Sequence, residues 1–304
     1  MGKKDDRLFV LGGNDAEMEL VKGLLARAGL RFIQPEKGWG DHKFSPEKLG
    51  LKIDPEQYGN DRRHVPAIVR GVSHAYFVEC QPAEWPTGTS VVVIDHHGDR
   101  SGEPASVLQV IVALAEVAKA TEANAGNAGG DEKEGLLRHA EQIREALNLS
   151  GSTRRWVELI AANDAGYIPA MLALGASAEE IARVRALERS CQGVTPEQES
   201  AAEVAIAAPP EHVGQYRVIR LAHSKCATAT DRLFRSGQPE RVLVLSGDGE
   251  VNVFGDGATC VALKERFEGW NGGSGLGDVN GQAFWGGYPS HDELVSWFKE
   301  RFTS

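Results

Sequence analysis

The sequence predicts an α/β protein, in which a parallel β-sheet flanked by helices is followed by a smaller α/β domain. Three observations predict this fold. Short apolar runs alternate with segments of helical period through the first half of the chain, polar residues gather where the apolar runs end, and a stretch rich in proline and alanine precedes a second set of apolar runs. Such alternation is typical of strands joined by helices that cover the sheet.

The first strand is predicted in residues 7–13, RLFVLGG, which end in two glycines. Residues 15–29 follow with leucines and a valine on one helical face and a glycine as the stop. Two more strands are predicted in 75–80 and 90–97, with the turn-forming QPAEWPTG between them. Together these segments form strand, turn and helix units.

Helical segments continue the first domain. Residues 105–120 and 136–149 have helical period, and the low-complexity segment 121–135 between them is predicted to be a flexible surface loop. Further on, IAANDAGYI places Asn163 and Asp164 at a break in a helical run.

The chain turns polar and rich in proline and alanine between residues 191 and 212, so this stretch is predicted to link a first domain, 1–190, to a second, 213–304. The second domain is predicted to contain strands in 215–223, 241–247 and 250–255, an aromatic-studded glycine loop in 269–290 and a closing helix in 291–302.

Composition excludes several classes of function. The net charge of -10 disfavours a long nucleic-acid duplex as partner, because such binding neutralises many phosphates with a basic surface. No apolar run reaches the length of about 18 residues that a membrane span needs, and the first residues lack the apolar region of a signal peptide, so a cytoplasmic protein is expected. The four cysteines are scattered, which disfavours a structural zinc site and predicts reduced thiols.

Polar residues that follow the predicted strands are the candidates for a functional site. In an open parallel sheet, ligands bind beyond the carboxyl ends of the strands. The candidates there are Asn14, Asp15 and Glu17 after the first strand, Glu79 after the second, and Asp95, His96 and His97 after the third, with Asp164 further along. Carboxylates mixed with imidazole suit manganese, or magnesium where oxygen ligands dominate. The sequence therefore predicts a metal centre.

Each candidate also has a plainer explanation. Asp15 and Glu17 could be first-turn acids that complement a helix dipole, and Glu79 could be a solvated strand end. Asp164 could simply end a helix. Two imidazoles and a carboxylate directly after VVVI are unusual for a turn, and this combination favours the metal centre.

These motifs resemble those of a known family. The IDHH run, the acidic residue sixteen positions earlier in FVEC, the early NDAE and the later ND resemble the DHH phosphoesterase superfamily. That superfamily includes family II inorganic pyrophosphatases, single-strand exonucleases, and nanoRNA and cyclic-dinucleotide phosphodiesterases. The glycine loop near the C-terminus resembles the substrate-binding DHHA1 domain that accompanies the first domain in many members.

The resemblance assigns roles by position. Asp15 and Glu17 take the place of the first-motif D-x-D, and Glu79 stands where an aspartate usually bridges two metals. His96 would be a metal ligand supported by Asp95. The remaining assignments are His97 facing the substrate phosphate and Asp164 as the fourth-motif metal ligand.

Three positions depart from the family pattern. The histidine that usually precedes the first motif is absent, and its neighbourhood contains Gly12 and Gly13. Two expected aspartates are the glutamates at 17 and 79. The C-terminal loop reads GGSGLGD, with Ser274 in place of a glycine.

The resemblance implies hydrolysis of a small phosphodiester, a short oligonucleotide or dinucleotide, by metal-activated water with Mn²⁺, or Mg²⁺, as cofactor. The expected substrate-binding residues are Arg100, Gly272, Gly273, Ser274 and Gly275. Trp270 or Trp285 would stack on a base. Short single-stranded nucleic acid is an expected partner, a membrane is not, and a homodimer is compatible with the pattern.

Two other functions stay open. A binding or regulatory protein that has kept the fold and lost efficient catalysis would explain the missing first-motif histidine. A phosphatase that acts on a non-nucleotide phosphate would use the same metal chemistry.

Overall fold

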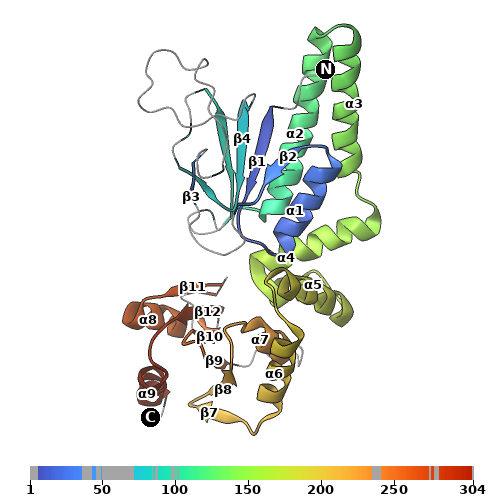
Figure 1. The fold of residues 1–304 in the computed structure, drawn as a ribbon. Coiled ribbons are helices and arrows are strands. Elements are labelled where there is room, and N and C mark those ends of the chain that lie inside the picture. The colour runs from blue at the N-terminus through green and yellow to red at the C-terminus, as the bar shows by residue number, and fades with distance from the viewer. Residues whose placement is uncertain are drawn as a thin grey trace. The chain divides into compact units, whose positions relative to one another are not determined.

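The computed structural model describes residues 6–35, 43–45, 49, 72–83, 85, 88–96, 100, 103–234, 241–273, 275–276 and 281–302. The chain divides into two compact units, Met1–Ala170 and Met171–Ser304. Each unit combines a β-sheet with helices, so the predicted α/β class is confirmed (Figure 1).

The first unit is built on a four-stranded sheet in the order β2-β1-β4-β6. Its strands are β1 (Arg7–Leu11), β2 (Arg31–Ile33), β4 (His74–Val78) and β6 (Ser90–Ile94), and every pair is parallel. All five residues of β1 are buried. A strand with neighbours on both sides and cover on both faces needs a nearly continuous apolar run, which explains the sequence RLFVL.

Helices cover one face of this sheet. They are α1 (Ala16–Arg27), α2 (Ser106–Asn127) and α3 (Gly130–Leu147), which lie together on one side of the strands in Figure 1. Phe9 and Leu11 of β1 pack there in one core with Leu25 and Leu114. On the opposite face, Val10 packs with Phe44 of the short strand β3 (Lys43–Phe44), which pairs with β5 (Gln81–Pro82).

The segment 121–135 is not a loop, and that prediction was wrong. Helix α2 continues to Asn127 and α3 begins at Gly130, so the two helices form an αα-hairpin. Thr121, Ala125 and Ala140 are buried. Small residues and good helix formers such as alanine let two helices pack closely, and composition alone does not distinguish this use from low complexity.

Helix α4 (Gly151–Ala173) contains the break that the sequence predicts, a few residues later than Asn163 and Asp164. The backbone is non-helical at Gly166 and Tyr167, so Asp164 lies in the helical part just before the break. Pro169 explains the position, because its ring cannot donate a hydrogen bond and clashes with the carbonyl four residues earlier.

The second unit contains a six-stranded sheet in the order β11-β12-β10-β9-β8-β7. Strands β8 and β9 pair in parallel, and the other neighbours are antiparallel. The strands are β7 (Glu211–Val213), β8 (Tyr216–Leu221), β9 (Val242–Ser246), β10 (Val251–Asp256), β11 (Trp270–Gly272) and β12 (Gln282–Gly287).

Helices lie on both faces of the second sheet. One core, which includes Tyr216, Trp285 and Phe298, involves α8 (Gly257–Phe267) and α9 (His291–Phe302). The core on the other face contains Ala202 of α6 (Pro196–Ala207) and Ala229 of α7 (Ala227–Phe234). None of the helices that the structure describes combines the length and apolarity needed to cross a bilayer.

Much of the predicted glycine loop 269–290 is a strand pair, β11 with β12. Glycines lie beneath aromatic rings across the pair. A Cβ added at Gly286 would meet the Trp270 indole at 2.5 Å, and one at Gly272 would meet the Phe284 ring at 2.8 Å. The glycines therefore allow flat aromatic rings to lie over the neighbouring strand.

The stretch 191–212, predicted to be a linker, contains helix α6. The division into compact units falls earlier, after Ala170, and places α5 (Ala178–Cys191) and α6 in the second unit. Thr195 and Gln198 form a capping box at the start of α6. Composition suggested a linker because proline and polar residues also serve as helix starts.

Candidate metal centre

Four side chains of the first unit converge where the parallel strands end. Glu17 lies in the first turn of α1, Glu79 follows β4, His96 follows β6, and Asp164 belongs to α4. One ligand atom from each lies within 4.8 Å of the others. Glu17 is 1% exposed and His96 is 7% exposed, so the cluster is shielded from bulk water. We call these four residues the acidic–histidine cluster.

Contacts within the cluster link the imidazole to the carboxylates. His96 Nε2 contacts Asp164 Oδ2 and lies 3.5 Å from Glu79 Oε1. Glu17 Oε1 accepts a hydrogen bond of 2.8 Å from the backbone N of Val107, in the first turn of α2. The positive end of the α2 dipole therefore helps to hold this carboxylate.

The electrostatics show that the cluster has an excess of negative charge. Burial raises the pKa of the Glu17 carboxyl well above its usual range, and the negative charges of Asp164 and Glu79 add to the rise. Burial alone would lower the pKa of the His96 imidazole, but contacts with Asp164 and Glu79 outweigh it and raise that pKa to about 10. A bound divalent cation would relieve this repulsion and compete with protons for the same ligand atoms. The residues present therefore fit a metal ion.

Backbone strain lies beside the cluster. Glu79 has φ of 52° and Tyr167, three residues after Asp164, has φ of 59°. A non-glycine residue in this left-handed region costs about 1 to 3 kcal/mol, and such positions concentrate at functional sites. The hydrogen bond of 2.9 Å from Glu79 N to Ile94 O ties the strained residue to β6.

Close packing explains the glycine at position 12. A Cβ added to Gly12 would lie 2.3 Å from the backbone oxygen of Glu79. Gly12 N also donates a hydrogen bond of 2.8 Å to Val78 O. A histidine cannot occupy this position while Glu79 stays where it is.

The other predicted residues of the first unit lie in different settings. Asp15 begins α1 as its N-cap, with Oδ1 accepting a 2.7 Å hydrogen bond from Met18 N. The backbone oxygen of Asp95 accepts a bond of 3.2 Å from Gln109 Nε2. Arg100 Nη1 donates a bond of 2.8 Å to the Val93 carbonyl. His97 lies outside the described residues.

In the second unit, the two tryptophans predicted to stack on a base differ in their exposure to solvent. Trp285 is fully buried, and its Nε1 donates a 2.7 Å hydrogen bond to Glu268 O, so it cannot stack on a ligand. Trp270 is 41% exposed, and Phe284 of the same strand pair is 38% exposed. The glycines at 272, 273 and 275 are described, and Ser274 is not.

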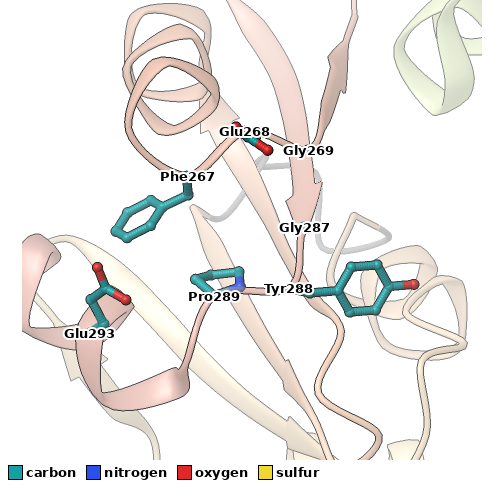
Figure 2. A pocket seen from close by; sticks show the side chains of 7 residues that line it. All are labelled: Phe267, Glu268, Gly269, Gly287, Tyr288, Pro289 and Glu293. Carbon is teal, nitrogen blue, oxygen red and sulfur yellow. The ribbon is translucent and has the colours of Figure 1, made fainter.

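A pocket of the second unit lies near this aromatic strand pair (Figure 2). It is lined by Phe267, Glu268, Gly269, Gly287, Tyr288, Pro289 and Glu293. Two of these residues carry carboxylates, and Glu293 pairs with Arg266 at 3.1 Å. The residues that line the pocket supply two carboxylates and no cationic side chain, which disfavours a phosphate ligand there.

Sequence reasoning did not identify two backbone features of the site. The Val107 N–H that holds Glu17 comes from the start of a helix. The sequence PASV, where that helix begins, could have indicated this N–H group. The close approach of Gly12 to Glu79 had a weaker signal, the glycine pair after the first strand.

Neither a protein-family model nor a curated protein matches the chain. Among solved structures, it is similar to RecJ from Thermus thermophilus in complex with Mn²⁺, with 15% identity, a TM-score of 0.39, and coverage of 97% of this chain and 51% of that one. It thus spans about half the length of that RecJ chain. It is similar to exonuclease RecJ bound to manganese with 12% identity, a TM-score of 0.38, and coverage of 99% and 90%.

The chain is also similar to a pGpG-specific phosphodiesterase, PggH, from Vibrio cholerae, with 10% identity, a TM-score of 0.35, and coverage of 97% of this chain and 98% of that one.

Proposed function

We propose that the chain is a metal-dependent phosphoesterase that hydrolyses a small phosphodiester, either a short oligonucleotide or a dinucleotide. The observation that supports it is the acidic–histidine cluster, in which three carboxylates and an imidazole converge at the carboxyl ends of parallel strands. This mixture of ligands suits Mn²⁺, with Mg²⁺ as the alternative.

A divalent ion, when bound, supplies a Lewis acid and lowers the pKa of a water molecule. Glu17, Glu79, His96 and Asp164 would hold the ion, and the Val107 N–H keeps the Glu17 carboxylate in place. We assign Asp95 to orienting His96, and His97 to contact with the substrate phosphate. These two roles rest on the resemblance of the IDHH run.

Arg100 is assigned to a substrate phosphate. One guanidinium nitrogen, Nη1, is bonded to the Val93 carbonyl, and that contact anchors the side chain to β6. Arginine has five N–H donors, so the remaining ones can meet a phosphate while the anchor is kept.

In the second unit, we assign phosphate contact to the glycine segment and base stacking to the exposed rings. The segment Gly272, Gly273, Ser274 and Gly275 would contact a phosphate through backbone N–H groups. Gly275 N already donates a hydrogen bond of 3.1 Å to Gln282 O, so its own N–H takes no part. Trp270 and Phe284 expose much of their rings at strands β11 and β12. Stacking a base on such a ring contributes about 1 to 3 kcal/mol.

Metal dependence tests the function. Protein freed of metal with a chelator should not hydrolyse a dinucleotide, and Mn²⁺ should restore hydrolysis, because the cluster carboxylates need a cation between them. Product release measured by chromatography checks this, with Ca²⁺ as a control that binds oxygen ligands in a looser geometry.

Three results would separate the candidate functions. Hydrolysis that persists in chelator contradicts the metal centre. Metal-dependent binding of the dinucleotide without turnover favours the binding or regulatory protein, for which the missing histidine at Gly12 is the specific observation. Hydrolysis of a simple phosphate monoester, but of no nucleotide, favours the phosphatase.

The length of the substrate gives a second prediction. A chain of net charge -10 repels a polyanion, so affinity should rise over the first two or three nucleotides and then level off. Binding is measured across oligomers of about two to twenty nucleotides at two salt concentrations. A steep gain for the longest oligomers would reveal a basic track and contradict the small substrate.

Trp270→Ala should weaken binding of the shortest oligomers by about 1 to 3 kcal/mol, because a stacking face is lost. Leu276→Ala is the matched control, since Leu276 is also 41% exposed but has no aromatic ring. Equal losses in the two variants would contradict base stacking on Trp270.

A further inference from the structure

We propose that the acidic–histidine cluster binds one divalent ion per chain. The motif pattern of the family that the sequence resembles would instead predict two ions. The inference depends on the metal centre of the proposed function and does not depend on hydrolysis. Three features carry it: the spacing of the donor atoms, the packing at Gly12 and the use of the carboxylates near the start of α1.

The donor spacing fits a single coordination sphere. Metal–ligand bonds to oxygen and nitrogen are about 2.0 to 2.2 Å long, so two donors on opposite sides of one ion are about 4.4 Å apart. All four donors of the cluster lie within 4.8 Å of one another. In a two-metal site the ions are about 3.5 to 4 Å apart, which spreads the outermost donors well beyond that distance.

Position 12 cannot supply a donor for a second ion. The family pattern places a histidine near here, and the chain has Gly12, whose Cβ would lie 2.3 Å from the Glu79 backbone oxygen. Since Glu79 is itself one of the four donors, moving its backbone to admit a side chain would disturb the cluster.

The acids at the start of α1 are partly committed to helix ends. Asp15 Oδ1 caps α1 by accepting from Met18 N, and Glu17 Oε1 accepts from Val107 N at the start of α2. Glu17 is one of the four converging donors, and Asp15 is not among them. Among the residues that the structure describes, the donors that converge are therefore a set for one ion.

Metal counting in the absence of substrate tests the inference. The full chain is freed of metal, loaded with Mn²⁺ and passed over a desalting column, and metal per chain is measured by elemental analysis. One ion per chain is expected. Low-temperature electron paramagnetic resonance should show the signal of isolated Mn²⁺. Two ions per chain, or an exchange-coupled signal, would overturn the inference.

Two variants test whether residues outside the cluster bind a second ion. Asp15→Asn keeps an N-cap, because asparagine caps helices as well as aspartate does, and removes the charge. Its Mn²⁺ content should stay at one ion per chain, with affinity within about threefold of the parent. A parent that holds two ions and an Asp15→Asn variant that holds one would make Asp15 a ligand of a second ion and overturn the inference. His97→Ala should still bind one ion. A parent that holds two ions and a His97→Ala variant that holds one would place His97 in a second site and overturn the inference.

The outcomes also separate this inference from the proposed function. One ion with no hydrolysis of any phosphodiester rejects the function and keeps the inference. Two ions with hydrolysis rejects the inference and keeps the function. No bound Mn²⁺ rejects both.

Discussion

Replacing His96 by alanine should remove metal-dependent hydrolysis almost completely while the first unit stays folded. His96 contributes the imidazole of the cluster and contacts two of its carboxylates. Loss of a partner that merely supports a ligand costs about 10- to 100-fold in metal affinity or activity, and loss of a ligand itself should exceed about 100-fold. Mn²⁺ affinity by calorimetry and turnover of a dinucleotide measure the effect.

His74→Ala is the matched control. His74 begins β4 at the other end of the sheet, and its Nδ1 contacts Ser73 Oγ at 2.7 Å. It should bind Mn²⁺ and turn over substrate like the parent, and circular dichroism checks that both variants are folded. Normal metal affinity in His96→Ala would remove His96 from the metal centre.

Asp231→Asn should destabilise the second unit by about 3 to 5 kcal/mol, because removing one partner of a buried ion pair leaves charge uncompensated. Asp231 is 1% exposed and accepts from Arg185 Nε at 3.0 Å and from Arg189 Nη1. Arg189 also binds Glu199 of α6 at 2.6 Å. Urea unfolding, followed by hydrogen exchange of the α5 to α7 amides, measures the loss.

Asp292→Asn is the control for this second change. Asp292 is exposed in the first turn of α9, so its replacement should change the free energy of unfolding by no more than about 0.5 kcal/mol. Proteolysis gives an independent readout, since residues 191–212 should resist cleavage in the parent and be cut in Asp231→Asn. Rapid cleavage of this stretch in the parent would mean that it behaves as the linker that its composition predicts.

The sheet of the first unit was predictable where its strands are strongly apolar. RLFVL and SVVVI both became parallel strands, with the polar residues at their carboxyl ends. Strand β2 has three residues, too few for a periodic signal. The extents of α2 and α3 were missed because burial of Thr121 and Ala125 depends on a partner helix that a local pattern does not reveal.

The sequence predicted that acids and histidines at strand ends would form the candidate site. It did not predict which of these residues would converge. In the sequence, Asp15 matches the D-x-D pattern, and Glu17 departs from it by being a glutamate. In the structure, Asp15 caps its own helix, whereas Glu17 reaches the start of α2 and joins the cluster. Which of the two acids joins the cluster depends on contacts with a helix ninety residues further along the chain, as the hydrogen bond between Glu17 and Val107 shows.

The order of strands in the first sheet also sets when the proposed metal ion could be captured during synthesis. Strand β1 is made first, yet it pairs with β4, in the register Arg7 with His74, and Asp164 comes later still. A growing chain that has left the ribosome only through β6 and the residues just after it holds three of the four ligands, Glu17, Glu79 and His96. Tight binding of the proposed ion would therefore begin only after α4 has emerged, and the ion would act as a late check on the folding of the first unit.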